Sequence, residues 1–381
     1  MLARKLGSVL REVWLLVGIT LLWLVGLEVA ARVAFAARDV WRAGGDARLS
    51  EWSLGADVYR HQEWAREYWR EEDLTSQTTF ANWHSYVYWR RKPYQGKYIN
   101  IDANGLRKTW NRTSAPSPSQ IKIFMFGGSA MWGTGARDEF TIPSWLSKKL
   151  QERNVDVWVT NFGEGGYVST QEVIALMLEL QKGNVPDVVI FYDGANDVFS
   201  AFQQGVAGLP QNEYNRVQSF NQLNWRGEIL EKLALYRAAR GLVAAVQGRP
   251  VPKDDARLVE AVMDVYFSNQ RIVSTLAQEY GFTALFFWQP TIYTKPRLSA
   301  WEMQVRNLYG EAEFFQRAYR ALAQRLQTLQ PTNVYDLSHA FDDKAGTVFI
   351  DTFHISEAGN ARIADLMIQT LPLSSRRNLS R

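Results

Sequence analysis

The chain of 381 residues is predicted to fold as an α/β protein, a three-layer sandwich around a central parallel sheet of five strands. One observation is a set of short apolar runs, rich in β-branched and aromatic residues and without alternation, which is typical of strands buried on both faces. The other is that segments with helical spacing lie between these runs. The strands expected are residues 121–126, 155–161, 187–193, 283–289 and 333–337.

The helical segments carry recognisable start signals. Pro143 stands in the first turn of one helix, Ser169 or Thr170 is expected to cap the next, and Ser356 to cap the last. The helices expected between and after the strands are residues 141–153, 169–183, 258–281, 311–329 and 357–371. Strands that alternate with helices indicate a doubly wound sheet, and ligands of such sheets bind beyond the carboxyl ends of the strands.

Residues 1–37 are predicted to form a membrane anchor. The run VWLLVGITLLWLVGL, residues 13–27, has no charge, and apolar sequence continues to residue 36. This run is shorter than the roughly 20 residues of a membrane span, but Glu28 and Arg32 lie near one end, where side chains reach the interface. A cleaved signal peptide is the alternative. We expect the bulk of the chain outside the cytoplasm, because a short basic head before a first helix usually stays inside.

Residues 38–118 are rich in Trp, Tyr and Arg and are predicted to form a cap on the main domain. Within them, residues 63–74 have the pattern of a short amphipathic helix, and extended pieces surround a turn at residues 102–105. The link at residues 111–120 is rich in Pro, Ser and Thr without hydrophobic period, which marks a boundary.

Charge and cysteine content exclude several classes of protein. The formal net charge is +4 with scattered Lys and Arg, so no basic stripe indicates nucleic-acid binding. The absence of cysteine excludes a thiol nucleophile, a zinc knuckle and a disulfide framework. The histidines are few: His61, His84, His339 and His354. We expect the first two to be surface or packing residues and His339 to be structural.

Three loops follow the first three strands and bring polar or small residues to one edge of the sheet. They are Gly127-Gly128-Ser129, residues 161–167 and residues 193–197, and a fourth block, Asp351 to His354, precedes the last helix. The carboxyl ends of parallel strands meet at the same edge, so these loops are expected to converge there.

The residues in these loops have the chemistry of nucleophilic acyl transfer. Ser129 is a weak nucleophile until a base takes its proton, and His354 is the candidate base. Asp351 is placed to receive the proton of the other ring nitrogen and so to fix the tautomer. Donors for the developing oxyanion are the backbone N–H groups of Ser129 and Gly166 and the side-chain amide of Asn196.

Four blocks resemble those of the SGNH hydrolases, also called the GDSL esterase family. They are FMFGGSAMWG, NFGEGGYVS, YDGANDVF and IDTFHISEAGN, and the resemblance runs from residue 121 to about residue 371. It implies a flavodoxin-like SGNH fold over residues 119–375, with Ser129 as nucleophile, His354 as base and Asp351 as its partner. It also implies Gly166 and Asn196 as oxyanion donors. The family's usual Gly-Asp-Ser is Gly-Gly-Ser here.

Other interpretations of the same residues fail on detail. The first glycine block lacks the Lys of a phosphate-binding loop, and the second lacks the spacing of a dinucleotide turn. No two histidines have the helical spacing of a metal site, so neither a metal nor a cofactor is expected. Asp193 and Asp197 flank Asn196 like the carboxylate pair of a glycoside hydrolase, but with a serine nucleophile we expect them to hold the loop.

The predicted function is that of a membrane-anchored serine esterase, which cleaves an acyl ester through an acyl-serine. O-acetyl groups on extracytoplasmic carbohydrate are the leading substrate, and residues 198–257 form an insertion expected to be a partly helical lid. One alternative is an acyltransferase that moves the acyl group to a glycan hydroxyl. The other is a non-catalytic protein that binds carbohydrate or assists assembly. The sequence leaves both open.

Overall fold

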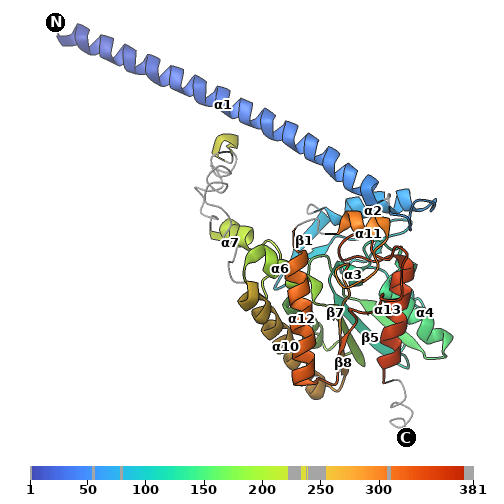
Figure 1. The fold of residues 1–381 in the computed structure, drawn as a ribbon. Coiled ribbons are helices and arrows are strands. Elements are labelled where there is room, and N and C mark those ends of the chain that lie inside the picture. The colour runs from blue at the N-terminus through green and yellow to red at the C-terminus, as the bar shows by residue number, and fades with distance from the viewer. Residues whose placement is uncertain are drawn as a thin grey trace. The chain divides into compact units, whose positions relative to one another are not determined.

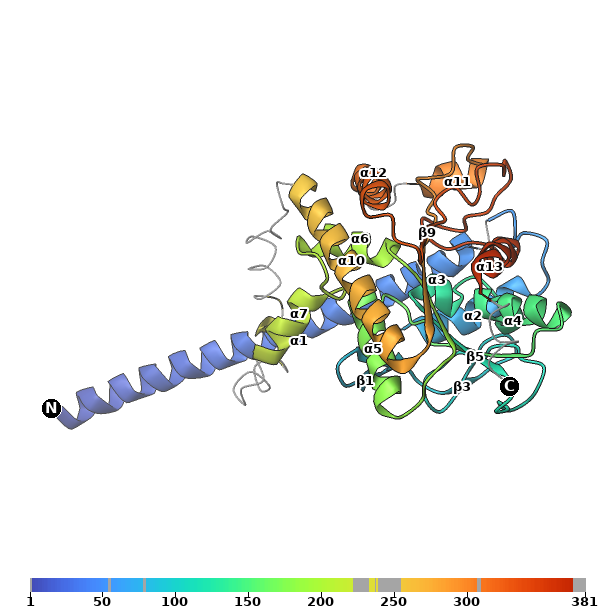
Figure 2. The same cartoon turned by 90° about the horizontal axis from the view of Figure 1, so that it is seen from below.

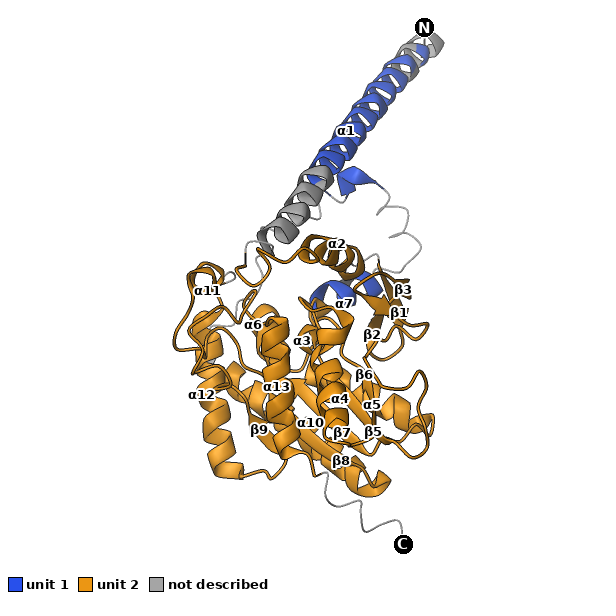
Figure 3. Ribbon diagram, turned by 90° about the vertical axis from the view of Figure 1, so that its right-hand side faces the viewer, with its two compact units in different colours: residues 1–49, 214–251 blue, residues 50–213, 252–381 orange. Residues whose placement is uncertain are grey.

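The computed structural model describes residues 2–53, 56–77, 80–221, 233–236, 238, 255–306 and 310–372. The chain divides into two compact units, which Figure 3 distinguishes by colour. The amino-terminal unit comprises residues 1–49 and 214–251, and the sheet unit comprises residues 50–213 and 252–381. All four blocks that carry the candidate site lie in the sheet unit.

The described part of the sheet unit contains a five-stranded parallel sheet with the order β6-β5-β7-β8-β9. Its strands are β5 (Ile121–Gly127), β6 (Val157–Asn161), β7 (Val188–Asp193), β8 (Thr283–Trp288) and β9 (Val334–Asp336). Each overlaps the run predicted for it, so the expected parallel sheet is confirmed. The first strand in sequence lies inside the sheet, and the chain crosses from it to both sides.

Helices cover both faces of this sheet and complete the predicted three layers. α4 packs on α13, and on the other side α10 packs on α5, α6 and α12. Figures 1 and 2 show the two groups on either side of the strands. Their bounds are α4 (Ile142–Glu152), α5 (Ser169–Gln181), α6 (Ala195–Gln204), α10 (Asp255–Tyr280), α12 (Ala312–Leu329) and α13 (Glu357–Thr370). Shorter helices of the sheet unit are α3 (Ser129–Trp132), η2 (Asp138–Phe140) and α11 (Ala300–Val305), whereas α7 (Glu213–Asn221) belongs, apart from its first residue, to the amino-terminal unit.

The sheet interior is apolar on both faces, as the lack of alternation predicted. All residues of β7 are buried. Phe126, Phe191 and Phe286 are register partners on neighbouring strands, and their rings stack with centroids 5.3 and 5.0 Å apart. Such cross-strand aromatic pairs stabilise a sheet beyond the burial of their area.

The edge strand β6 is closed by a side chain that imitates a neighbouring strand. Asn111 Nδ2 donates to Val159 O, and Val159 N donates to Asn111 Oδ1, both at 2.9 Å. These bonds occupy backbone groups that an edge strand otherwise offers to another chain. The predicted boundary link therefore also protects the sheet.

In the cap region, the described residues after Ser53 contain one α-helix and two small antiparallel pairs of strands. These are α2 (Ala65–Ser76), β1 (Ala81–His84) with β2 (Tyr88–Arg91), and β3 (Tyr94–Gln95) with β4 (Asn100–Ile101). The predicted amphipathic helix and the turn at residues 102–105 are both present, and Gly105 closes the turn with a φ of +77°. Glu71 on α2 accepts the backbone N–H groups of Lys97, Tyr98 and Ile99, which fixes the helix to the β3–β4 hairpin.

The start of α5 differs from the prediction. Its cap residue is Val168 rather than Ser169 or Thr170. The carboxylate of Asp197 accepts from both the backbone N–H and the hydroxyl of Ser169, so a side chain from another loop satisfies the helix end. The expected cap of the last helix is confirmed, because Ser356 Oγ accepts from Gly359 N at 3.3 Å.

In the amino-terminal unit, α1 (Leu2–Ser53) extends well past residue 37, where the apolar run and the predicted anchor end. Its segment Arg11–Arg38 contains an 18-residue window with a mean hydropathy of 2.2 and is long and apolar enough to cross a membrane. Within the same unit, Glu28 accepts the backbone N–H groups of Ala234 and Leu235 at 2.7 and 2.9 Å. Much of the predicted insertion at residues 198–257 lies outside the described residues.

Candidate active site

Ser129 is the first residue of α3, directly after β5 and a two-glycine turn. A Cβ on Gly127 would lie 2.4 Å from Tyr192 O, and a Cβ on Gly128 would lie 2.0 Å from Asn196 Nδ2. The first contact is with backbone, so residue 127 needs glycine, whereas the second is with the end of a side chain, so a side chain at residue 128 would displace the Asn196 amide. The missing side chain at residue 128 therefore makes room for the Asn196 amide beside the serine.

Ser129, His354 and Asp351 form a continuous hydrogen-bonded row. Ser129 Oγ lies 2.6 Å from His354 Nε2, and His354 Nδ1 lies 2.6 Å from Asp351 Oδ2. The other carboxylate oxygen of Asp351 accepts the backbone N–H groups of Phe353 and His354 at 2.8 Å, so the carboxylate is fixed in place. The structure thus brings together side chains that are 225 residues apart in the chain.

Electrostatics in this row suit proton transfer from the serine. Burial by itself lowers the pKa of His354, but the charge and hydrogen bond of Asp351 outweigh it, so the pKa lies above its ordinary value. Burial raises the pKa of Asp351, but His354 and the two backbone donors outweigh that effect and hold the pKa below its usual range. Asp351 is therefore ionised at neutral pH, and only 15% of the His354 side chain is exposed.

Of the predicted oxyanion donors, Asn196 lies beside the residue before the serine, and Gly166 lies in the loop that Asn196 contacts. Asn196, in the first turn of α6, donates from Nδ2 to Tyr167 O at 2.8 Å, and the same nitrogen lies against Gly128. Gly166 precedes Tyr167 in the loop of residues 162–168, the β6–α5 loop, and has a φ of +77°. Asn196 Nδ2 carries two hydrogens, so one remains for substrate after the bond to Tyr167.

Gln211 lies beside two of the three predicted oxyanion donors, Asn196 and Gly166, and was not predicted from the sequence. Its Nε2 donates to Asn196 Oδ1 at 3.5 Å, and its Oε1 lies 3.3 Å from the position that a Cβ on Gly166 would take. The bond to Oδ1 and the bond from Nδ2 to Tyr167 set which end of the Asn196 amide faces the serine. Gln211 lies in a polar stretch with no motif of its own, so no local pattern indicates it.

The cap reaches the site through Arg91 and Glu72. The Arg91 guanidinium lies 3.5 Å from the centre of the Trp132 ring, one turn after Ser129, and pairs with Glu164 of the β6–α5 loop at 3.3 Å. Glu72 on α2 accepts from the Thr134 hydroxyl at 3.1 Å. The charge of Glu72 raises the pKa of His354 and that of Arg91 lowers it, so both act on the base. The cap is therefore part of the candidate site.

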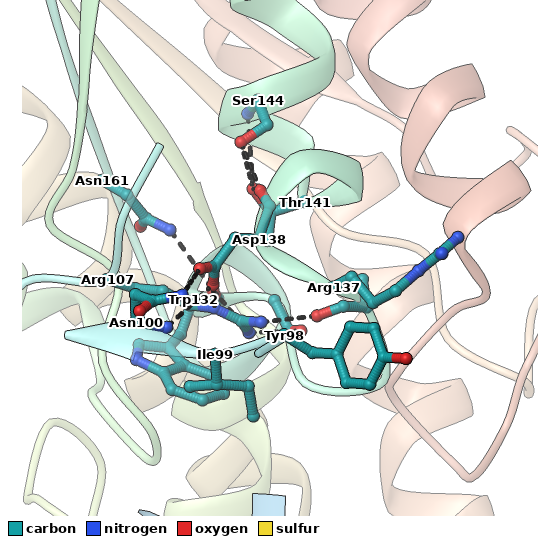
Figure 4. Close-up of polar contacts among 12 residues, drawn as sticks. Tyr98, Ile99, Asn100, Arg107, Trp132, Arg137, Asp138, Thr141, Ser144 and Asn161 are labelled. Carbon is teal, nitrogen blue, oxygen red and sulfur yellow. Dashed lines mark hydrogen bonds and ion pairs between the residues drawn. The ribbon is translucent and has the colours of Figure 1, made fainter. Parts of the chain in front are cut away.

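Arg107 holds the segment that follows the serine. It is fully buried, pairs with Asp138 at 3.0 Å, and donates to the carbonyls of Gly133 and Ala136. Figure 4 shows its guanidinium beside Asp138 and Asn100 with the Trp132 ring below it, 4.2 Å from the guanidinium carbon to the ring centre. Removing one partner of a buried ion pair is strongly destabilising, so this network fixes the backbone that follows α3.

The remaining acidic and histidine candidates lie away from the row. Asp193 and Asp197 are buried, and burial raises the pKa of Asp197 to about 6 although Ser169 hydrogen-bonds to it. Their burial keeps them from acting as an exposed carboxylate pair, and Asp197 holds a loop as predicted. His61, His84 and His339 are exposed. Within the described residues no three His, Cys, Asp or Glu side chains are arranged to hold a metal ion.

Comparison with known proteins shows which family and which solved structures this chain resembles. A family model described as GDSL-like lipase/acylhydrolase matches residues 125–362. Similar solved structures include the acetyl xylan esterase AlAXEase, with 15% identity, a TM-score of 0.40, and 66% of this chain and 100% of that chain covered. TesA has 16% identity and a TM-score of 0.36 over 66% and 99% of the two chains. A variant of Axe2, an acetyl xylan esterase from Geobacillus stearothermophilus, has 14% identity and a TM-score of 0.37 over 66% and 94%. No curated protein matches the sequence.

Proposed function

Because the chain belongs to the GDSL-like lipase/acylhydrolase family and is therefore a serine ester hydrolase, we propose that Ser129, His354 and Asp351 are its catalytic triad. The observation that carries this proposal is the row of two 2.6 Å contacts that joins the three side chains. Each atom has the neighbour that its role needs: a base nitrogen for the hydroxyl and a carboxylate for the other ring nitrogen.

The reaction proceeds in two halves. Ser129 Oγ attacks the ester carbonyl carbon while His354 Nε2 takes the hydroxyl proton, and Asp351 stabilises the imidazolium that forms. The oxyanion is met by the N–H groups of Ser129 and Gly166 and by Asn196 Nδ2. His354 then gives its proton to the leaving alcohol, which leaves an acyl group on Ser129. Water, deprotonated by His354, attacks the acyl-serine. His354 then returns that proton to Ser129 Oγ as the acyl–oxygen bond breaks, so the free acid departs and the resting serine is restored.

The substrate that we propose is a short acyl ester, such as an acetyl group, on extracytoplasmic carbohydrate. Two features support it. The helix α1 contains a segment that suits a membrane anchor, with a short basic head before it. The cap that adjoins the β6–α5 loop is rich in aromatic side chains with polar edges, including Tyr88 and Trp89. Such side chains bind ligands that are partly apolar and partly polar.

A covalent label tests the triad directly. We expect a fluorophosphonate probe to form an adduct with the full-length protein in detergent, because the phosphorus centre accepts an activated serine hydroxyl. Peptide mass spectrometry should place the adduct on Ser129, and the same preparation should hydrolyse p-nitrophenyl acetate. An adduct on another serine, or hydrolysis that survives complete labelling of Ser129, would contradict the proposed nucleophile.

Replacement of Asn196 by alanine tests the oxyanion donors. We expect kcat for p-nitrophenyl acetate to fall on the order of 10²-fold with KM little changed, because the lost donor acts chiefly on charge that develops in the transition state. Steady-state kinetics measure both constants, and fluorophosphonate labelling at Ser129 should continue at a reduced rate. An unchanged kcat in a folded variant would leave Asn196 without this role.

A further inference from the structure

Three aromatic side chains of the β1–β2 hairpin form a row that leads to the candidate site. The centroids of Trp83 and Tyr88 are 5.4 Å apart, and those of Tyr88 and Trp89 are 6.5 Å apart with ring planes inclined by 23°. Trp89 in turn meets Tyr167 of the β6–α5 loop edge to face at 5.4 Å. We call Trp83, Tyr88 and Trp89 the aromatic row, and its inner end lies beside the predicted oxyanion donor Gly166.

The row depends on an unusual backbone at Tyr88. Trp83 and Trp89 are register partners, so their side chains share one face of the hairpin. Regular alternation would put Tyr88 on the opposite face from its neighbour Trp89. Instead its φ is +76°, and its ring contacts both tryptophans. A positive φ is uncommon for a tyrosine, and here it belongs to the tight turn of the hairpin, where Tyr86 also has a φ of +70°. Its consequence is that the Tyr88 ring reaches the face that carries both tryptophans.

The inner end of the row is fixed to the loop that carries Gly166. Trp89 Nε1 donates to Gly165 O at 3.0 Å, and the hydroxyl of Tyr167 donates to Trp89 O. On the same strand pair, Gln171 Nε2 donates to Val87 O at 2.8 Å. These hydrogen bonds hold the inner end of the aromatic row in place before a ligand binds, which lowers the entropy cost of binding.

The outer end of the row is open to solvent and has polar neighbours. Trp83 is 70% exposed. It lines, together with amide and imidazole side chains, a cavity of about 590 Å³. The amide and imidazole side chains of this cavity are Asn82, His84, Asn104 and Asn184, and its charged side chains are Arg90, Arg91, Glu179 and Lys182. Trp83 is the member of the aromatic row that lines it. Tyr88 donates its hydroxyl to Glu213 at 3.1 Å, so the middle of the row is polar at its edge as well.

This combination selects one class of ligand. Flat aromatic faces with hydrogen-bonding groups at their edges suit a sugar ring, which has apolar C–H faces and hydroxyl groups at its rim. A long acyl chain needs an unbroken aliphatic surface, which this row does not offer. We propose that the aromatic row binds the carbohydrate part of an O-acylated polysaccharide and carries its ester to Ser129. The inference rests on the proposed esterase function and names the substrate class for it.

A comparison of two kinds of ester tests the row. Chemically acetylated xylohexaose and cellohexaose present several sugar rings that the row could bind, whereas p-nitrophenyl acetate has no sugar. We expect Trp83→Ala in the full-length protein to lower kcat/KM for at least one acetylated hexaose about tenfold and to leave kcat/KM for p-nitrophenyl acetate within about twofold.

The hairpin supplies a matched control. Tyr86 is 73% exposed and makes no ring contact with another described residue. Tyr86→Ala should therefore leave kcat/KM for both kinds of ester within about twofold. Equal losses in the Trp83 and Tyr86 variants, or no loss in the Trp83 variant, would overturn the proposal. It would equally be overturned if Trp83→Ala impaired only cleavage of p-nitrophenyl palmitate, because the row would then serve acyl chains.

A binding measurement separates this inference from the catalytic one. Ser129→Ala protein, which keeps the row, should bind unmodified xylohexaose or cellohexaose in calorimetric titrations, and adding Trp83→Ala should weaken that binding about tenfold. If the wild-type protein takes no fluorophosphonate label and cleaves no ester but still binds a hexaose through Trp83, the esterase mechanism fails and the row stands. If it cleaves p-nitrophenyl acetate while neither hexaose binds, the row fails alone.

Discussion

Substitution of Ser129 by alanine should lower kcat for p-nitrophenyl acetate by at least about 10³-fold, because the variant has lost the hydroxyl that forms the acyl intermediate in the proposed triad. The loss should appear in kcat rather than in KM, since the oxyanion donors stay in place. Steady-state kinetics on the purified full-length protein measure it. The fluorophosphonate adduct should disappear from the variant at the same time.

An exposed serine provides the control for that experiment. Ser85 lies in the exposed turn of the β1–β2 hairpin, and Ser85→Ala should retain wild-type kinetics. The Ser129 variant should also unfold at a temperature close to that of the wild type, because the hydroxyl fills little volume and its polar partner within the described part of the chain is His354. A folded Ser129→Ala protein that keeps more than about a tenth of the wild-type kcat would exclude the acyl-serine mechanism.

The sheet could be predicted because its strands are recognisable from local sequence. A run such as residues 187–193 is apolar on both faces, and only a strand covered by helices on both sides hides such a run from water. The site followed from the sheet, since loops after parallel strands share one edge. The sequence pattern thus predicts that Ser129 and His354 lie at the same edge of the sheet but gives no distance between them. In the structure Ser129 Oγ lies 2.6 Å from His354 Nε2.

The length of α1 and the cap of α5 could not be predicted in the same way. The predicted anchor ends at residue 37 because the apolar run ends there, but helicity does not require hydrophobicity, and α1 continues to residue 53. At α5 the local sequence predicts Ser169 as the cap, but Asp197 in the first turn of α6 accepts the backbone N–H of Ser169 instead. Local patterns indicate which ends need a partner and leave open which residue supplies it.

The cap residues of the site are the clearest gap in the prediction. Arg91 and Glu164 are 73 residues apart, and neither stands in a motif that signals an ion pair. Gln211 is one polar residue among several in its stretch. Their positions follow from how the cap packs on the β6–α5 loop, which is a property of tertiary structure. The family blocks identify the reacting groups, whereas the groups that orient them are particular to this chain.

Asp351→Asn should be nearly as damaging as loss of the nucleophile. The asparagine Oδ1 can still accept from the backbone of Phe353 and His354, so the loop keeps its shape. Its Nδ2, however, donates to His354 Nδ1, so the ring proton moves to Nε2. The Nε2 atom then faces the Ser129 hydroxyl without a free lone pair and cannot accept the serine proton. We expect kcat to fall about 10³- to 10⁴-fold, as the wrong tautomer predicts.

The pH profile distinguishes this cause from general damage. His354 must be neutral to act as a base, so wild-type activity is lost as the pH falls through the raised pKa of His354, above its ordinary value of about 6.5. Without the Asp351 charge, burial lowers that pKa, and the acid limb of the remaining activity should move to lower pH. His339 and Asp342 form an exposed pair at 2.9 Å with the same spacing, so Asp342→Asn is the matched control and should change neither kcat nor the limb. An acid limb that stays in place in Asp351→Asn would mean that Asp351 does not set the charge of the base.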